Sequence, residues 1–373
     1  MHPKVTCSFL LLLYAQLFTT IDITQSHNFS ISTFSGYSSM TNVEQFSQEL
    51  LLAKRLKSDI YQFWQQGNFS SFLGVDNARI NYVYFNQSQA TKCIVIVNGR
   101  NESYLKYKEL SYDLSQQGYQ VFLFDHRGQG LSERLLNSPH KGYVKSFNDY
   151  IVDLSSFINT VVKANCATKP YLLAHSMGAA IATRYLQNNP NVIQAAVLSS
   201  PMFGFNAGGI PQVIAKSLIK GLHTINQVTS STPWYFLAHQ DYKKSDFKDN
   251  VLTQSELRYE IFNSLLEEQP AIQLGGVTLN WLVEGIKAQE EIFNEIEKVS
   301  TPIIVLQAGK DTVIDNSAQD KFCENLHKLQ PQSCPNGLVK NIEGALHELF
   351  FEKDNYRNQA LSEVILWFNQ HSK

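Results

Sequence analysis

Short, fully apolar segments alternate with helix-like segments along most of this chain. Between them lie stretches with helical spacing, such as "YLKYKELSYDLSQQG" and "FNDYIVDLSSFINTVVKAN". Strands that are apolar at successive positions are typical of a parallel sheet covered by helices on both faces. The pattern therefore predicts an α/β fold with a mostly parallel central sheet flanked by helices. The predicted strands are residues 93–99, 119–130 (a strand with its turn), 170–176, 195–201, 302–311 and 338–347.

One long segment interrupts this alternation. Residues 202–299 contain helical segments near 254–268 and 281–297, and they separate the fourth predicted strand from the fifth. We interpret them as an inserted, mostly helical cap; two further β-α units are the alternative. The core is then expected to comprise residues 42–201 and 300–373, starting with a packing helix over 42–64 and an alternating strand over 78–86.

The N-terminus has the composition of a targeting segment. Lys4 precedes an apolar stretch from Val5 to Phe18, which is short for a membrane span and typical of a secretory signal. Residues 1–26 are therefore predicted to be a signal peptide with a loose N-terminal stretch. The protein is expected to be exported, either periplasmic or secreted. An uncleaved segment that holds the protein at a membrane is the alternative.

Four cysteines follow the predicted signal, and an even number in an exported chain suggests disulfides. Four cysteines allow three pairings. Cys323 and Cys334 are close enough in sequence to close one loop. Cys93 and Cys166 both precede predicted strands, so they meet at one edge of the sheet if those strands are neighbours. Four free thiols are the alternative.

The composition excludes some classes of function. The formal net charge is −2 and there is no long basic run, so no nucleic-acid partner is expected. The sequence has neither an H-E-x-x-H nor a C-x-x-C motif, so neither a metal nor another cofactor is expected.

A serine stands at the predicted corner between the strand over 170–176 and the helix that follows it. Ser176 has Ala174 two residues before it and Gly178 two residues after it. A sharp strand-serine-helix turn exposes the hydroxyl and tolerates only very small residues at those two positions. The common pattern is G-x-S-x-G, and here Ala174 replaces the first glycine. The spacing predicts a nucleophilic serine.

A serine hydroxyl needs a base that is itself oriented by an acid. In sheets of this kind the chain order is serine, acid, histidine. Asp311 ends the fifth predicted strand, with Asp315 as the fallback, and His347 follows the sixth. We therefore predict a catalytic triad of Ser176, Asp311 and His347.

The oxyanion of an acyl-transfer reaction needs two donors. The backbone N–H of Met177, next to the nucleophile, is one candidate. The N–H of Arg100 is the other, since Gly99 permits a tight turn after the strand over 93–99. The string "DHRGQGLSE" lacks the spacing of a phosphate-binding loop and is interpreted as a tight turn.

These motifs together resemble bacterial lysophospholipases of the α/β-hydrolase superfamily, which are close kin of monoacylglycerol lipases. The resemblance runs from about Phe63 to near the C-terminus. It rests on "VNGRNESYLKYKELSYDL", "DHRGQGLSERLL", "PHKGYVKSFNDYIVDL", "LLAHSMGAAIA", "NVLTQSELRY" and "EGALHELFFEKD". Two local departures are Asn98-Gly99 where relatives commonly have His-Gly, and Ala179 where close relatives often have glycine. The predicted signal peptide also departs from the family pattern, and it puts the usual inner-membrane or cytoplasmic location in doubt.

The resemblance implies an α/β-hydrolase fold, the triad and oxyanion donors named above, and an acyl-chain pocket under the cap. The expected substrate is a single-chain lipid ester, with peripheral membrane contact through the cap. Alternatives are a monoacylglycerol lipase, a carboxylesterase, an acyltransferase or a non-catalytic binding protein of the same fold. The cap residues expected to line the acyl pocket are Phe203, Phe205, Trp234 and Trp281.

Overall fold

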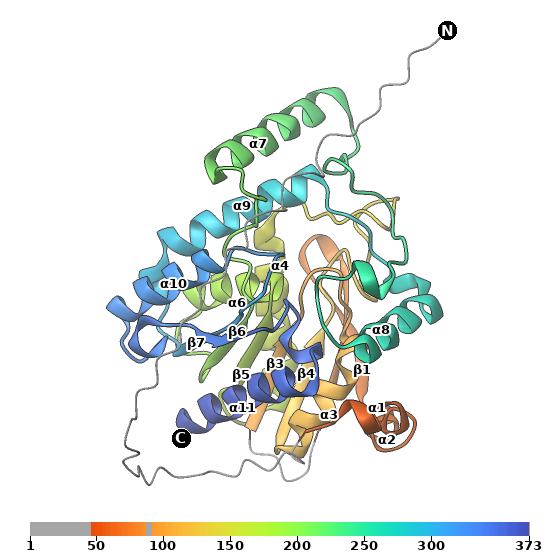
Figure 1. Cartoon of the computed structure of the whole chain (residues 1–373), viewed down its shortest axis with the longest axis vertical. Helices are drawn as coiled ribbons and strands as arrows, with labels where there is room; N and C mark the ends of the chain where they lie inside the picture. The colour runs from red at the N-terminus through yellow and green to blue at the C-terminus, as the bar shows by residue number, and fades with distance from the viewer. Residues whose placement is uncertain (1–45, 87–91, 373) are drawn as a thin grey trace, which may run out of the picture. The chain divides into compact units, whose positions relative to one another are not determined.

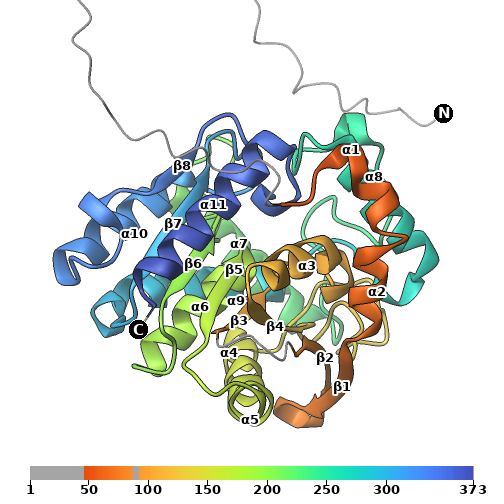
Figure 2. The same ribbon diagram turned by 90° about the horizontal axis from the view of Figure 1, so that it is seen from below.

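The computed structural model describes residues 46–86 and 92–372 and builds them around one sheet. Within these residues the sheet has eight strands in the order β1-β2-β4-β3-β5-β6-β7-β8, which can be followed in Figure 2. β2 is antiparallel to both β1 and β4, and every other neighbouring pair is parallel. The strands are β1 (Asn68–Leu73), β2 (Arg79–Phe85), β3 (Lys92–Val97), β4 (Tyr119–Phe124), β5 (Tyr171–His175), β6 (Ala196–Ser199), β7 (Ile303–Ala308) and β8 (Lys340–Ile342).

Helices cover both faces of the sheet, as the apolar strands require. In β3, Val95 and Val97 pack with α4 and α6, whereas Ile94 and Ile96 pack with α3 and α11 on the opposite face. This alternation divides the core into two layers on either side of the sheet. The helices of the α/β core are α1 (Glu49–Arg55), α2 (Asp59–Gln65), α3 (Lys108–Gln116), α4 (Phe147–Phe157), α5 (Lys163–Asn165), α6 (Met177–Asn188), α10 (Asn316–Leu329) and α11 (Asp354–Gln370).

The segment between β6 and β7 contains the α-helices α7 (Gln212–Thr229), α8 (Glu256–Glu268) and α9 (Leu279–Asn294). Two of these helices were expected from the sequence, and α7 was not. Figure 1 shows α7 lying beyond α9, at the outer side of this insert. None of the described helices is long and apolar enough to cross a membrane.

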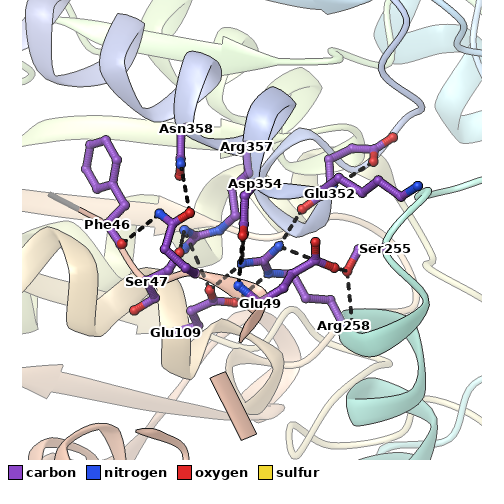
Figure 3. A network of polar contacts seen from close by, with 12 residues as sticks. Phe46, Ser47, Glu49, Glu109, Ser255, Arg258, Glu352, Asp354, Arg357 and Asn358 are labelled. Atoms are coloured by element: carbon purple, nitrogen blue, oxygen red, sulfur yellow. Dashed lines mark hydrogen bonds and ion pairs between the residues drawn. The ribbon is translucent and has the colours of Figure 1, made fainter. Parts of the chain in front are cut away.

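A buried network of charged residues holds α8 of the insert against the core (Figure 3). The Arg258 guanidinium donates to both carboxylate oxygens of Glu109 on α3, at 2.9 and 2.8 Å, and to Asp354 on α11 at 2.8 Å. Arg357 of α11 donates to Asp113 of α3 at 2.6 Å. Glu109 lies within ion-pair distance of both guanidiniums, and each guanidinium has a further carboxylate beside it, so the buried charges are compensated and α8 is held against the core.

Two disulfides are present. Cys93 in β3 is bonded to Cys166, which precedes β5, and β3 and β5 are neighbouring parallel strands. Cys323 in α10 is bonded to Cys334, eleven residues later. The first bond therefore joins segments far apart in sequence, whereas the second closes a short local loop.

The structure differs from the sequence expectations in several places. The expected single helix over 42–64 is two helices, α1 and α2, separated by a turn at residues 56–58. β1 was not expected; its residues are mostly exposed, so they lack a buried stripe. The sixth expected strand, over 338–347, contains only the three residues of β8. The predicted signal peptide, residues 1–26, lies outside the described residues.

Candidate active site

Ser176 lies at a sharp corner between β5 and α6. Its backbone has φ 53° and ψ −116°, a left-handed conformation that is strained for a residue with a side chain. Gly178 is required at the next turn of the corner, since a Cβ there would lie 2.2 Å from the Val97 carbonyl oxygen and 2.4 Å from that of Asn98. The end of β3 passes directly against the corner and leaves no room for a side chain at Gly178. This is the physical reason for the small residue that the spacing predicts.

Ser176, His347 and Asp311 form one hydrogen-bonded chain. The Ser176 hydroxyl lies 2.9 Å from His347 Nε2, and His347 Nδ1 lies 2.6 Å from Asp311 Oδ2. The residues come from the corner after β5, the loop after β7 and the loop after β8. Parallel strands that end at the same edge of the sheet therefore bring together residues separated by up to 171 positions.

The Asp311 carboxylate is held in place by its own loop. Its Oδ1 atom accepts hydrogen bonds from the backbone N–H groups of Val313 at 2.8 Å and Ile314 at 3.3 Å. Its side chain is completely buried. Asp315, the alternative acid, instead accepts from the backbone N–H of Ser317 at 3.0 Å and caps helix α10.

The expected oxyanion donors lie on two sides of the corner. Met177 is the first residue of α6, where a backbone N–H has no partner within the helix. Arg100 follows Gly99, and a Cβ on Gly99 would lie 3.0 Å from the His175 ring, next to Ser176. Neither N–H donates a hydrogen bond to another described residue. Both remain available for a ligand.

The string "DHRGQG", expected to form a tight turn only, also braces the loop that carries Arg100. His126 Nε2 donates to the Asn98 carbonyl at 3.0 Å. Gln129 Nε2 donates to the Gly99 carbonyl at 2.7 Å and to that of Glu102 at 3.0 Å. Asp125 accepts the Ser103 hydroxyl at 2.9 Å. These side chains fix the carbonyls of the loop and so orient its N–H groups. In the sequence, the signal that could have pointed to these bracing side chains is that they all lie within one short, uninterrupted string.

A buried ion cluster lies beside the histidine. Lys106 Nζ lies 2.8 Å from Glu102 and 2.6 Å from Glu348, the residue after His347. Burial alone would raise the pKa of Glu102, but the Lys106 charge and hydrogen bond hold that pKa at about 2. Burial raises the pKa of Glu348. The Glu102 carboxylate also accepts the Gly99 N–H, so the cluster ties the Arg100 loop to the His347 loop.

His175 is a second imidazole in this region. Its ring centroid lies 4.9 Å from that of His347. Burial lowers the pKa of His175 to about 3, so the ring is neutral at physiological pH. It has no hydrogen bond to Ser176, which leaves His347 as the described histidine in contact with the Ser176 hydroxyl.

The four aromatic cap residues have different surroundings. Phe205 and Trp281 lie together, with ring centroids 6.1 Å apart, and the Arg100 guanidinium lies 5.8 Å from the Trp281 ring. Phe203 instead packs against Phe322 of α10 at 4.3 Å and is only 2% exposed, so it belongs to the core. Trp234 lies on the surface at 39% exposure. The sequence could not separate these cases, because aromatic side chains serve both roles.

Known proteins resemble this chain in sequence as well as in fold. The family model described as "Serine aminopeptidase, S33" matches residues 88–354. Lysophospholipase L2 of Escherichia coli (strain K12) is 38% identical over 310 residues, which are 83% of this chain and 90% of the relative. Monoglyceride lipase of Rattus norvegicus is 24% identical over 287 residues, 76% of this chain and 84% of the relative.

Solved structures confirm the fold class. A soluble variant of monoglyceride lipase from Saccharomyces cerevisiae, in complex with a substrate analog, superimposes with a TM-score of 0.62 at 19% identity. The match covers 82% of this chain and 97% of that one. Monoacylglycerol lipase of Paleococcus ferrophilus gives a TM-score of 0.60 at 20% identity, covering 79% and 99%. With a family model matching most of its length and close relatives aligned nearly end to end, this chain belongs to the serine aminopeptidase S33 family of the α/β-hydrolase superfamily.

Proposed function

We propose that this protein is a serine hydrolase of single-chain lipid esters, specifically a lysophospholipase that releases a fatty acid through an acyl-enzyme. The hydrogen-bonded chain from Asp311 through His347 to Ser176 carries the proposal, because it supplies a nucleophile, a base and an orienting acid in one buried line. The names of the relatives, lysophospholipase L2 and monoglyceride lipase, support a lipid ester as the substrate.

The geometry supports the following reaction. His347 Nε2 takes the proton from the Ser176 hydroxyl as Oγ attacks the ester carbonyl. The backbone N–H groups of Arg100 and Met177 receive the oxyanion. His347 then donates the proton to the departing alcohol, leaving the acyl group on Ser176. Water, activated by the same imidazole, attacks the acyl-enzyme and releases the fatty acid.

The acyl chain needs an apolar wall beside the nucleophile. We assign Phe205 to this wall, because its backbone pairs with Ile314 in the Asp311 loop. Phe203 supports this wall from the core, and Trp234 lies on the outer surface of the insert. Phe205 is therefore the one of the four predicted cap residues that we assign to the acyl pocket, since Trp281, at 3% exposure, is buried in the same core cluster as Phe203.

The insert also offers a surface for contact with a lipid bilayer. On α7, the residues at positions 214, 218, 225 and 228 follow one helical face. Their side chains, Ile214, Leu218, Ile225 and Val228, are between 52% and 82% exposed. An exposed apolar stripe of this kind is typical of helices that lie in a membrane interface. We assign this stripe to peripheral membrane contact, which would give the site access to lipid substrate.

The two disulfides support an exported location. Bonds such as Cys93–Cys166 and Cys323–Cys334 persist in oxidising compartments and are rare in a reducing cytosol. We therefore propose a periplasmic or secreted location, with an uncleaved N-terminal segment that holds the protein at a membrane as the alternative.

The test is direct. Purified protein is assayed for fatty-acid release from lysophosphatidylcholine, from a monoacylglycerol of the same chain length and from a short-chain ester, and is labelled with a fluorophosphonate probe. We expect lysophospholipid hydrolysis and labelling, and Ser176→Ala should abolish both. Unchanged hydrolysis by Ser176→Ala would refute the nucleophile. Transfer of the acyl group to an acceptor without fatty-acid release would identify an acyltransferase instead.

A further inference from the structure

A cavity of about 410 Å³ lies between the loops that carry Arg100 and Glu348 and the insert. One part of its wall comes from the active-site loops, through Arg100 and Glu348, the residue after His347. Another part comes from the insert, through His239 and Lys243. The cavity therefore extends from the proposed oxyanion loop into the insert, where the leaving group of a bound ester would lie.

The Arg100 guanidinium is a cation without a counterion in this wall. Its one hydrogen bond to a described residue is from Nη1 to the Gly275 carbonyl at 3.0 Å, and the guanidinium forms no ion pair with a described acid. Burial lowers the pKa of Arg100 to about 10, so the side chain is still charged at neutral pH. A half-buried charge without a partner is costly, and a bound anion would remove that cost.

The other cations that line the cavity fall into two groups. Lys106 and Arg258 are each neutralised, Lys106 by Glu102 and Glu348 and Arg258 by Glu109 and Asp354. Lys243, in contrast, forms no ion pair with a described residue. Arg100 and Lys243 therefore carry the uncompensated positive charge of this cavity.

The remaining polar groups of the lining are a histidine and two acids. His239 Nδ1 accepts the Val277 N–H at 3.1 Å, so the proton of the neutral ring is on Nε2, which is a donor. Of the two acids that line the cavity, Glu348 is paired with Lys106, whereas Asp241 accepts the Tyr235 hydroxyl and keeps its negative charge. The groups that can recognise a phosphate are therefore the Arg100 guanidinium, the Lys243 ammonium and the Nε2 donor of His239.

We propose that this cavity holds the phosphodiester headgroup of a lysophospholipid, with the Arg100 guanidinium as its main contact. The inference rests on the proposed function and names the headgroup it selects. The backbone N–H of Arg100 faces the ester, and its guanidinium lies one side-chain length away. In the substrate, the glycerol carbons separate the ester from the phosphate by a comparable span. One residue thereby contacts both the ester carbonyl oxygen and the phosphate of the substrate, with Lys243 as a second, outer cation.

The experiment compares two substrates with the same acyl chain, lysophosphatidylglycerol and monoacylglycerol, in wild type and Arg100→Gln. The measured quantity is kcat/KM for lysophosphatidylglycerol divided by kcat/KM for monoacylglycerol. If Arg100 makes a charge-assisted contact to the phosphate, this ratio should fall at least about 10-fold in Arg100→Gln. Arg100→Lys should restore part of the ratio, and Lys243→Gln should lower it by a smaller factor. The control is Lys248→Gln, a similarly exposed lysine outside the cavity, which should leave the ratio unchanged.

The possible outcomes distinguish the proposed headgroup site from the proposed lysophospholipase function. The fluorophosphonate labelling rate and the thermal midpoint report whether Arg100→Gln still folds with a reactive serine. If wild type hydrolyses both substrates and the ratio does not move in the folded Arg100→Gln, the headgroup site is refuted while the proposed function stands. If wild type hydrolyses neither lipid, the proposed function itself fails. Inhibition by inorganic phosphate that disappears in Arg100→Gln, with an unchanged substrate ratio, would identify a free-anion site and also overturn the headgroup assignment.

Discussion

The Asp311 carboxylate lies 2.6 Å from His347 Nδ1, whereas Asp315, four residues later, caps helix α10. This separation of roles predicts the effects of matched substitutions. Asp311→Asn should lower kcat by about 10³- to 10⁴-fold, since the amide no longer holds the imidazole in the required tautomer. Asp315→Asn should retain activity, because asparagine caps helices as well as aspartate does. Steady-state kinetics on a lysophospholipid measure both.

An equal loss of activity in the two variants would contradict this assignment, provided that both remain folded by circular dichroism. So would a fully active Asp311→Asn.

Two glycines provide a second matched pair. A Cβ at Gly178 would lie 2.2 Å from the Val97 carbonyl oxygen, so Gly178→Ala must displace either the corner or the end of β3. Fluorophosphonate labelling should slow by at least about 100-fold, because a shift of about 1 Å at a catalytic group has a cost of this size. Gly221→Ala, in helix α7, meets no atom within 4 Å and should stabilise the protein slightly. Normal labelling of Gly178→Ala would show that the corner is less constrained than its geometry indicates.

The proposed triad could be predicted from sequence because its positions follow from topology. Parallel strands end at one edge of the sheet, so residues after β5, β7 and β8 must gather there. The bracing role of "DHRGQG" could not be predicted, because a string with turn residues does not reveal which carbonyls its side chains reach. His126 and Gln129 act on Asn98 and Gly99, about 30 positions away.

The two elements that were missed differ in the signal they carry. β1 is exposed at most positions and has no buried stripe, so its pattern gave no signal. α7 carries apolar residues at helical spacing, several of them exposed, and that periodicity could have predicted the helix. Phe203 illustrates the reverse case, since an aromatic residue near the site is part of the core. Sequence patterns thus predict the elements and residues whose positions follow from the parallel sheet. They do not predict an element such as β1, which buries few of its side chains.

The two disulfides should differ in their contribution to stability. Cys93–Cys166 spans 73 positions and Cys323–Cys334 spans 11. In the chain-entropy model the longer loop contributes about 4 kcal/mol and the shorter about 3 kcal/mol to the free energy of unfolding. Chemical denaturation of the Cys93→Ala/Cys166→Ala and Cys323→Ala/Cys334→Ala double variants should show the first to be less stable. A thermal midpoint that does not respond to reducing agent would contradict both contributions.

The apolar stripe of α7 predicts a loss of membrane binding without a loss of chemistry. Ile214→Asp/Ile225→Asp should reduce sedimentation with anionic liposomes by at least about tenfold, since each buried isoleucine contributes about 1.5–3 kcal/mol. Hydrolysis of a short soluble ester should be retained. Gln227→Asp, which adds one charge on a different face of the same helix, is the control. Equal binding by the double variant and the control would remove α7 from the membrane contact.

Two buried histidines predict how stability changes with pH. Burial lowers the pKa of His126 to about 4 and that of His175 to about 3, against about 6.5 in an unfolded chain. Above pH 6.5 both rings are neutral in either state, so their packing contributes fully. Below pH 6.5 the two histidines bind protons in the unfolded chain but stay neutral in the folded protein, so the free energy of unfolding falls. Between pH 7 and pH 5 each histidine should lower the free energy of unfolding by about 2 kcal/mol. Urea denaturation at both pH values measures the change, and His126→Gln, which keeps a donor for the Asn98 carbonyl, should make the change in the free energy of unfolding less unfavourable by about 2 kcal/mol than in wild type. If the wild type and His126→Gln lose the same amount, protonation of His126 does not govern acid stability.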